Sequence, residues 1–441
     1  MTYRKTTLEN GIRVVTETMS CTRSVAIGVL VDAGPRQDPD GLDGLSHMVE
    51  HLMFQGTSNR DSMQIANLMD MGGGHVGAFT TRDYTCYFAT VLDDYYTYTL
   101  DLFGDILLNS IFPEDDLERE KTAVLREIDA GSDSPDSRVH ALVKETAWPN
   151  HPLGKPMTGR PDGVQAMTRE DVIYFVHEQY TPDRLIVAAA GNVNHDDFVA
   201  QVRDSLWRML GERVERKQEK PEWKTAVSLK TMPVSQAYFS IALPAYEYTH
   251  ADRYSLHVLN NLLGGGISSR LFRRLREERG LVYNIGSEYH AYKDGGMMVI
   301  EGATTPDYLM TVLDMTMVEL RILFSGHDPV DPEELWKSKM QIRGQHLIAS
   351  EDVNTCMSRL ATQELYFGHH ISAAEIVSQI EGVDMVALEA TSEIMLANLS
   401  MATVAVVASD APHLYSEDSI AGLLNESIEK VQLLGFDTVL Q

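Results

Sequence analysis

Apolar residues in the first half of this chain occur in two different patterns of spacing. Some stretches are rich in β-branched residues or alternate between apolar and polar positions, which is typical of strands. Strands are expected at 12–18, 24–31 and 185–190, and a hairpin at 77–81 and 84–91. Other stretches have apolar positions three to four residues apart, which is typical of amphipathic helices. Helices are expected at 62–71, 94–109, 113–130, 137–148, 169–179 and 196–210.

The second half of the chain repeats part of this pattern. The segment 257–261 can be aligned with 47–51, which lies 210 residues earlier, and 335–345 can be aligned with 117–127, which lies 218 residues earlier. In this alignment Asn260, Asn261 and Gln345 take the places of Glu50, His51 and Glu127. We interpret the repeat as an internal duplication in which neutral side chains replaced a set of candidate metal-site residues. The alternative is a pair of unrelated helices that share a histidine.

A hydrophilic stretch between the halves, 211–224, carries Pro221 and lacks apolar periodicity, so it is typical of an exposed linker. We predict an N-terminal domain at 1–212, a linker at 213–225 and a C-terminal domain at 226–441. With 441 residues, 44% of them hydrophobic, the chain is long enough for two cores.

The formal net charge of −27 changes the picture of possible partners. Nucleic acid and anionic membrane surfaces would be repelled, so we expect neither as a partner. The charge permits basic peptides as ligands, although an acidic surface that only keeps the protein in solution is an equally good interpretation.

Cysteine usage and the apolar runs predict a location. Cys21, Cys86 and Cys356 are scattered and form no CxxC pair, which is typical of a reducing compartment. The first residues lack the apolar run of a secretory signal, and no window approaches 18 consecutive apolar residues. We therefore expect a cytoplasmic protein without a transmembrane helix.

Two histidines four residues apart stand in the stretch His47-Met48-Val49-Glu50-His51. On a helix these two positions share one face, so both rings could bind one metal ion, and Glu50 could take a proton from a water beside it. Asp43 is expected to cap this helix. The order His-x-x-Glu-His is the inverzincin signature. The broader pattern His-x-x-acid-His would arise by chance in a chain of this kind on the order of a few per cent of the time.

Two carboxylates lie on the apolar face of the helix expected at 113–130. Glu120 and Glu127 are seven residues apart, and they fall on the same stripe as Leu117 and Val124. A carboxylate that faces a core is costly unless it binds something. Glu127 would complete a set of two histidines and one glutamate that suits zinc, although other divalent metals could substitute. Glu120 is better placed as an acceptor for the N–H of a ligand histidine.

These motifs make the chain resemble the pitrilysin family of inverzincin metallopeptidases, in its short branch of processing-peptidase-like subunits. The resemblance is carried by His47-Met48-Val49-Glu50-His51 with Phe54-Gln55-Gly56-Thr57, and by Glu120 and Glu127 within 118–127. Further matches lie at 151–154, 180–182 and 190–193, so the resemblance covers essentially the whole chain. It implies two similar α/β-sandwich domains of the α+β class, each with a mostly antiparallel sheet flanked by helices, which together form half of a clamshell.

The resemblance also implies roles for individual residues. One Zn²⁺ per chain would be bound by His47, His51 and Glu127, with Glu50 as the general base. Peptide substrate would pair with the strand formed by Gly77, Ala78, Phe79 and Thr80. Family members usually have Asn where this chain has Gly77, and because that amide helps to hold the substrate, its absence puts binding strength in question.

Two further residues come from the second half. In the family, an Arg and a Tyr seven residues apart contact the substrate and the developing oxyanion, and here they are Arg276 and Tyr283. From the residues alone, a surface arginine and a core tyrosine would explain both. In short members this pair reaches the metal from another subunit. We therefore expect a homodimer that encloses a chamber and completes its active sites in trans.

Three functions compete at this point. The first is a zinc endopeptidase that acts on peptides or unfolded segments. The second is a catalytically silent or partner subunit of a processing-peptidase-like heterodimer, although such subunits typically lose the metal-binding residues that this chain keeps. The third is a metal-dependent hydrolase of a non-peptide bond.

Overall fold

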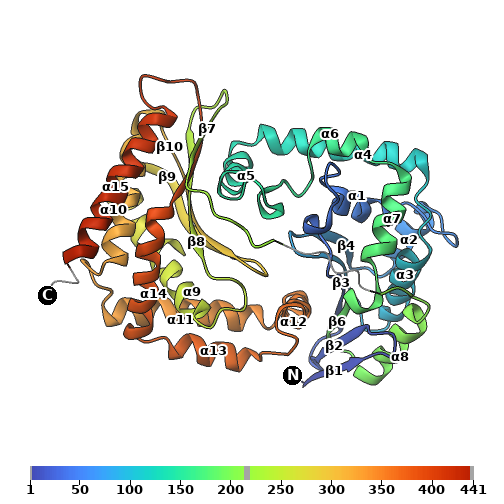
Figure 1. Ribbon diagram of the computed structural model, residues 1–441. Helices are drawn as coiled ribbons and strands as arrows, with labels where there is room; N and C mark the ends of the chain where they lie inside the picture. Colours follow the sequence, from blue (N-terminus) through green and yellow to red (C-terminus); the bar gives the residue numbers. More distant parts are fainter. Residues whose placement is uncertain (1, 213–218, 438–441) are drawn as a thin grey trace. The chain divides into compact units, whose positions relative to one another are not determined.

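The computed structural model describes the chain except for residues 1, 213–218 and 438–441 (Figure 1). The chain divides into two compact units. The first comprises Met1–Asp129, Lys155–Gln218 and Leu347–Ser372, and the second comprises Ala130–Gly154, Glu219–His346 and Ala373–Gln441. Each unit thus includes a segment from the other half of the sequence. The linker at 213–225 stays a prediction, because 213–218 lie outside the described residues.

The first unit is built on a six-stranded sheet in the order β1-β2-β6-β3-β5-β4. Its strands are β1 (Thr2–Thr7), β2 (Arg13–Thr18), β3 (Ser24–Val31), β4 (His75–Thr80), β5 (Thr85–Leu92) and β6 (Leu185–Gly191). Neighbours are antiparallel except for the parallel pair β2 and β6. The predicted hairpin is formed by β4 and β5, and β4 is the edge strand.

Helices cover both faces of this sheet, so β3 and β6 are buried along almost their whole length. One face packs against helices from the first half of the sequence. They are α1 (Leu45–Leu52), α2 (Ser62–Met71), α3 (Tyr96–Asn109), α4 (Glu114–Asp133), α6 (Pro161–Ala166), α7 (Arg169–Gln179) and α8 (His195–Leu206). The other face packs against α12 (Val353–Tyr366), whose Met357 and Leu360 contact apolar residues of β2, β3 and β6.

The second unit has a five-stranded sheet in the order β7-β11-β8-β10-β9. Its strands are β7 (Val227–Thr231), β8 (Ala237–Ala245), β9 (Val282–Ala291), β10 (Gly296–Thr304) and β11 (Thr403–Ala408). One face packs against α9 (Arg253–Gly264), α10 (Leu309–Phe324), α11 (Pro332–Ala349), α13 (Ala373–Gly382), α14 (Met385–Asn398) and α15 (Glu417–Asp437). The other face packs against α5 (Pro135–Ala147), which comes from the first half of the sequence.

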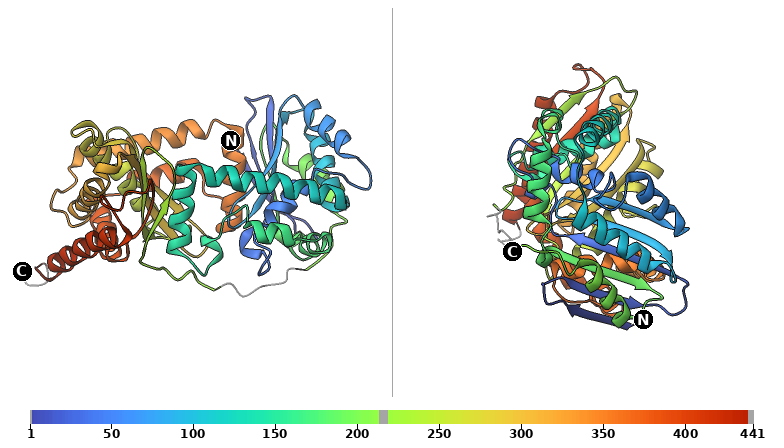
Figure 2. Two further views of the ribbon diagram at one scale, coloured as in Figure 1. Left: turned by 90° about the horizontal axis from the view of Figure 1, so that it is seen from above. Right: turned by 90° about the vertical axis from the view of Figure 1, so that its right-hand side faces the viewer.

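The two sheets share one topology, which confirms the predicted duplication of an α/β-sandwich domain. The order β7-β11-β8-β10-β9 repeats β2-β6-β3-β5-β4, and the one parallel pair falls at the same place in each sheet. Helices α4 and α11 begin at Glu114 and Pro332, which stand 218 residues apart as the sequence alignment requires. In Figure 2, α12 lies with the strands of the first unit and α5 with those of the second, so the two copies exchange one helix each.

The cysteines and the helices bear on the environment of the protein. Cys21 is exposed, Cys86 and Cys356 are buried, and none of the three forms a disulfide. Among the helices in the described part of the chain, none combines the length and the apolar character that crossing a bilayer requires.

Candidate metal centre

Helix α1 carries His47 and His51. Its N-terminus is formed by a glycine in the left-handed conformation and by a carboxylate that accepts backbone hydrogen bonds. Gly44 is the N-cap residue and has φ of +94°, a conformation that favours glycine. The carboxylate of Asp38 accepts hydrogen bonds from the backbone N–H groups of Gly44 and Ser46, at 2.7 and 2.8 Å. Asp43, which was expected to cap this helix, instead pairs with Lys155 at 2.7 Å, so that prediction was wrong. The cap therefore comes from a residue further upstream.

The apolar residues of α1 leave its functional residues on the remaining surface. Leu45, Met48, Val49 and Leu52 are fully buried in the core of the first unit. Helix α4 packs Leu117 and Val124 into that core. Beside them the Glu120 side chain is 12% exposed, whereas that of Glu127 is 49% exposed, so the expectation that both carboxylates face the core was wrong for Glu127.

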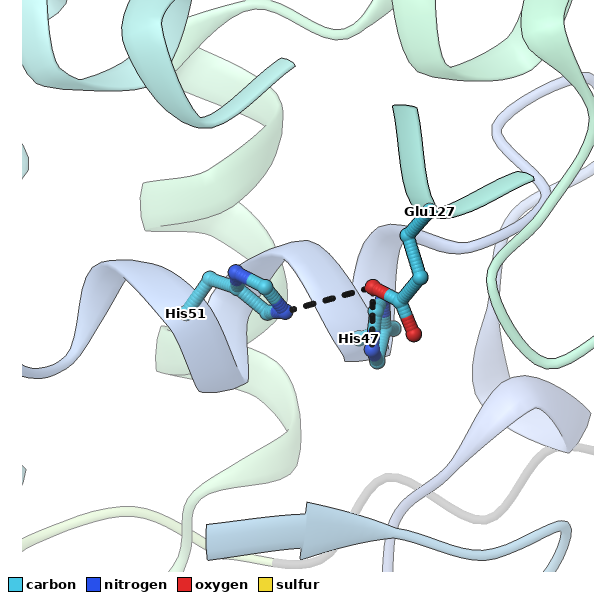
Figure 3. A group of neighbouring side chains, drawn as sticks. All are labelled: His47, His51 and Glu127. Atoms are coloured by element: carbon cyan, nitrogen blue, oxygen red, sulfur yellow. Dashed lines mark ion pairs between the residues drawn. The ribbon is translucent and has the colours of Figure 1, made fainter. Parts of the chain in front are cut away.

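The described side chains contain one group of three or more His, Cys, Asp or Glu residues whose atoms are close enough to hold a metal ion. It consists of His47, His51 and Glu127, whose ligand atoms all lie within 4.8 Å of one another. Glu127 Oε2 lies 3.8 Å from His47 Nε2 and 3.9 Å from His51 Nε2 (Figure 3). Two tetrahedral ligands at about 2.0–2.2 Å from one zinc ion lie ~3.4 Å apart, so a small inward movement would bring these atoms to zinc distances.

The orientation of His51 is set by a second carboxylate. Glu120 Oε2 lies 3.1 Å from His51 Nδ1, which leaves Nε2 of the same ring directed toward Glu127. A carboxylate on the far nitrogen of a ligand histidine is the usual arrangement around a metal ion. The other oxygen of Glu120 accepts a hydrogen bond from Gln55 Nε2 at 3.0 Å. Gln55 belongs to the motif at 54–57, but its position in the sequence gave no sign of this contact.

Burial changes the ionisation of two residues at this site. His47 is largely buried next to His51, and burial, with a smaller effect of the neighbouring histidine, lowers its pKa to about 4. It is therefore neutral near pH 7, which is the form that binds metals. Burial raises the pKa of Glu50, while a hydrogen bond of 2.5 Å from the Thr80 hydroxyl opposes that rise. A carboxylate of raised pKa is suited to accept and release a proton.

The predicted substrate strand lies on β4, at the edge of the first sheet. Val76 and Ala78 pack against the core that includes α1, whereas Phe79 is partly exposed and contacts Phe88 of β5 with a ring separation of 5.7 Å. Gly77 pairs with Phe88 across the hairpin. Thr80 differs from its neighbours because its side chain binds Glu50. It therefore has a contact with the predicted base that sequence spacing alone gave no means of finding.

Arg276 and Tyr283 lie close together in the second unit. Arg276 belongs to the π-helical segment Phe272–Glu277, and its Nη1 donates to the carbonyl of Val282 at 2.8 Å. Tyr283 follows Val282 on β9, an edge strand, and is 53% exposed. Its exposure argues against the core tyrosine that the residues alone suggested. Because the pair belongs to the second unit, its action on the metal ligands of the first remains a proposal.

The second copy keeps the contact between the two helices but changes its chemistry. Asn261 on α9 donates from Nδ2 to Ser338 Oγ on α11 at 2.9 Å. These residues occupy the places of His51 and Glu120 in the alignment of the copies. An amide and a hydroxyl preserve the hydrogen bond, but they are poor zinc ligands at these positions.

Comparison with known proteins identifies the family. Residues 13–160 match the family described as Insulinase (Peptidase family M16), and residues 166–342 match the family described as Peptidase M16 inactive domain. The chain belongs to peptidase family M16. The resemblance to pitrilysin-type metallopeptidases that the motifs indicated is thereby confirmed.

Relatives and solved structures agree with this assignment. The uncharacterized zinc protease YmxG of Bacillus subtilis is 36% identical over 382 residues, covering 87% of this chain and 93% of that protein. An uncharacterized zinc protease of Streptomyces coelicolor is 34% identical and covers 87% of this chain and 84% of that protein. The fold matches a peptidase M16 inactive domain from Pseudomonas fluorescens with a TM-score of 0.87 at 18% identity, covering 93% of this chain and 98% of that one. A protease from Helicobacter pylori matches with a TM-score of 0.85 at 22% identity, covering 92% and 99%.

Proposed function

We propose that this M16 peptidase family member is a zinc-dependent endopeptidase that hydrolyses peptides or unfolded segments. The observation that carries the proposal is the convergence of His47, His51 and Glu127 beside Glu50. Two imidazoles and one carboxylate are a donor set of catalytic zinc sites, which leave one position for water or substrate. The neutral state of His47 and the hydrogen bond from His51 to Glu120 support the same conclusion.

The side chains of the first unit divide the chemical work. A bound zinc ion supplies Lewis acidity toward the scissile carbonyl and favours the ionisation of water. Glu50 takes the proton of the attacking water and passes it to the leaving amine. The Thr80 hydroxyl orients the carboxylate of Glu50, and Glu120 orients the ring of His51. One zinc ion per chain follows, because in the second copy Asn260, Asn261 and Gln345 replace the charged and imidazole groups.

Substrate binds along the edge of the first sheet. The main chain of Gly77, Ala78 and Phe79 on β4 pairs with an extended peptide, as in other proteins that add a strand to an exposed edge. The net charge of −27 favours peptides with basic residues.

The second half supplies donors to a neighbouring copy. We propose a homodimer that encloses a chamber, in which Arg276 and Tyr283 of one chain stabilise the oxyanion at the metal ligands of the other. A donor at such a position is worth roughly 3 kcal/mol in comparable enzymes. The proposed location is the cytoplasm, and the three unpaired cysteines support a reducing compartment.

The test is a quenched peptide library incubated with the protein, with and without a zinc chelator. We expect chelator-sensitive cleavage that zinc restores. The Glu50→Gln variant should bind zinc as the parent does and lose activity by about a hundredfold or more. Absence of chelator-sensitive cleavage by the chain alone, with recovery after addition of a catalytic partner, would favour the silent partner subunit. Metal-dependent hydrolysis restricted to non-peptide bonds would favour the third function.

A further inference from the structure

The side chain of Gln55 lies between a hydrogen-bond donor, Arg119, and a hydrogen-bond acceptor, Glu120. Its Nε2 donates to Glu120 Oε1 at 3.0 Å, and its Oε1 accepts from Arg119 Nη2 at 2.9 Å. Arg119 is in turn paired with Asp116 at 2.7 Å. On the other side, Glu120 Oε2 contacts His51 Nδ1 at 3.1 Å. A continuous series of polar contacts therefore runs from the surface of α4 to the candidate metal ligand on α1.

An amide is the side chain that suits this position. Only a group that both donates and accepts can serve Arg119 and Glu120 together. A carboxylate at position 55 would bind Arg119 but repel Glu120, and an ammonium would do the reverse. The direct approach of Arg119 Nε to Glu120 Oε1 is 3.9 Å, which is too long for a hydrogen bond. The two charged groups thus form a direct ion pair, but the hydrogen-bonded link between them runs through Gln55.

The orientation of the Glu120 carboxylate depends on the hydrogen-bond partner of each of its two oxygens. The Glu120 side chain is only 12% exposed, so it has limited access to water as a replacement partner. With Oε1 held by Gln55, Oε2 is directed at His51 Nδ1. That contact leaves His51 Nε2 directed toward Glu127, as the candidate metal site requires.

We propose that Gln55 is a positioning residue that raises zinc affinity by fixing Glu120, and through it the ring of His51. The inference rests on the proposed function, because it takes His51 as a zinc ligand. Groups that orient a metal ligand directly change metal affinity or activity by about 10–100-fold. Gln55 acts one contact further out, so its loss is expected to weaken zinc binding by roughly three- to tenfold.

Three substitutions in the full-length protein separate the two contacts of Gln55. Gln55→Met keeps the length and loses both hydrogen bonds, Gln55→Glu keeps the contact with Arg119, and Gln55→Lys keeps the contact with Glu120. Zinc affinity is measured by competition with a chromophoric chelator, and thermal unfolding of the metal-free proteins is followed in parallel. Gln165→Met is the matched control, because Gln165 is an exposed residue of α6.

We expect Gln55→Met and Gln55→Glu to weaken zinc binding while the metal-free melting temperature stays close to that of the parent. Gln55→Lys should stay within about twofold of the parent, since a donor to Glu120 is retained. With zinc saturating, kcat should fall in the first two variants while KM is unchanged, because the substrate strand is untouched.

Parental zinc affinity in Gln55→Met would overturn the inference. Equal losses in Gln55→Met and Gln55→Lys would also overturn it, because the effect would then come from Arg119 or from packing. A parent protein that binds zinc and cleaves peptides, with variants indistinguishable from it, contradicts the role of Gln55 alone. A parent protein without zinc binding or chelator-sensitive cleavage contradicts the proposed function as well.

Discussion

The two largest influences on the pKa of the Glu50 carboxylate oppose each other. Burial raises its pKa, and the Thr80 hydroxyl, which donates at 2.5 Å, lowers it by stabilising the ionised form. The ionised form is the one that acts as a base, so activity is lost as pH falls through this pKa. Removal of the hydroxyl raises the pKa further, and the loss then begins at a higher pH.

Thr80→Val should therefore shift the acid limb of the kcat/KM profile to higher pH. Thr80→Ser is the control, because it keeps the hydroxyl and should keep the parental limb. The profile is measured with zinc saturating, so that proton competition for the ligands does not contribute. Coincident acid limbs in the parent and the valine variant would show that Thr80 does not tune the base.

Gly77 has no side chain with which to contact a peptide bound to the proposed substrate strand. A Cβ added there would meet the ring of Phe88 at 3.4 Å and His75 at 3.7 Å, which are ordinary contact distances. Gly77→Asn should therefore be accommodated and should add an amide next to the bound peptide. One such hydrogen bond is worth about 1 kcal/mol, so we expect KM to fall by roughly fivefold with zinc affinity unchanged.

The control for this substitution is Gly77→Ala. It removes the flexibility of glycine in a strand without adding a hydrogen-bonding group. If both variants lower KM equally, the benefit comes from a stiffer strand, and the amide has no part in binding substrate.

At the level of single residues, the spacing of residues within individual helices was enough to predict most of the candidate site. His47, Glu50 and His51 lie within about one helical turn of each other, and Glu120 and Glu127 share one helix face, so helical periodicity was enough to group each set. The contacts that were missed join residues far apart in the sequence. Thr80 reaches Glu50 across 30 residues, and Gln55 reaches Glu120 across 65. Contacts between residues so far apart in the sequence produce no local sequence pattern.

At the level of elements, the predictions succeeded where a segment has its own amphipathic pattern. The helices expected at 62–71 and 169–179 are observed as Ser62–Met71 and Arg169–Gln179. Strand β1 was not predicted, because it is largely exposed and lacks an apolar pattern. The packing of α5 and α12 on the sheets of the opposite copies was also not predicted. Both helices bury an apolar face, but the sequence does not say which sheet they cover.

The start of α1 gives a testable case of backbone geometry. Gly44 has φ of +94°, and a Cβ there would lie 2.6 Å from the backbone oxygen of Thr158. Gly44→Ala should therefore destabilise the protein by at least about 2 kcal/mol, from the left-handed conformation and from the displaced loop. Because His47 follows only three residues later, zinc affinity should fall with it.

The matched control is Gly41→Ala. Gly41 also has positive φ, at +84°, but a Cβ there meets nothing within 4 Å. Its cost should be limited to the conformational part, about 1 kcal/mol, with zinc affinity unchanged. Denaturant unfolding of the metal-free proteins gives both values, and equal losses in the two variants would show that the approach to Thr158 is unimportant.

At the level of the whole molecule, the duplication explains why the described part of the chain holds one candidate metal site. The five strands of the second sheet follow the order of β2-β6-β3-β5-β4 in the first, and the contact between α1 and α4 is kept in the second copy as the hydrogen bond of Asn261 to Ser338. The alignment of two short segments predicted this duplication. The matching sheet orders could not be derived in the same way, because they depend on pairings between strands more than a hundred residues apart.

The second copy has Asn261 and Gln345 in place of the candidate metal ligands His51 and Glu127, which is consistent with a different role for that half of the chain. Arg276 is tied to the carbonyl before Tyr283, so the two side chains are presented together from a π-helical segment and an edge strand. Segments of π-helix are frequent at functional sites. If their target is the metal site of another copy, inactivating lesions in the two halves should complement each other.

Mixing Glu50→Gln chains with Tyr283→Phe chains tests this arrangement. In a mixed symmetric dimer completed in trans, one site carries both lesions and the other carries none. Random exchange of subunits should therefore restore about a quarter of the parental activity, since half of the dimers are mixed and each has one intact site of two.

The control mixture combines Glu50→Gln with Glu127→Gln, two lesions of the same metal site. Every site in every dimer of this mixture carries one lesion, so no activity should return. Recovery in the first mixture and not in the second would establish completion by a partner. If neither mixture recovers although subunits exchange, Tyr283 acts at the metal of its own chain or does not act on the reaction, and the shared chamber is not needed for catalysis.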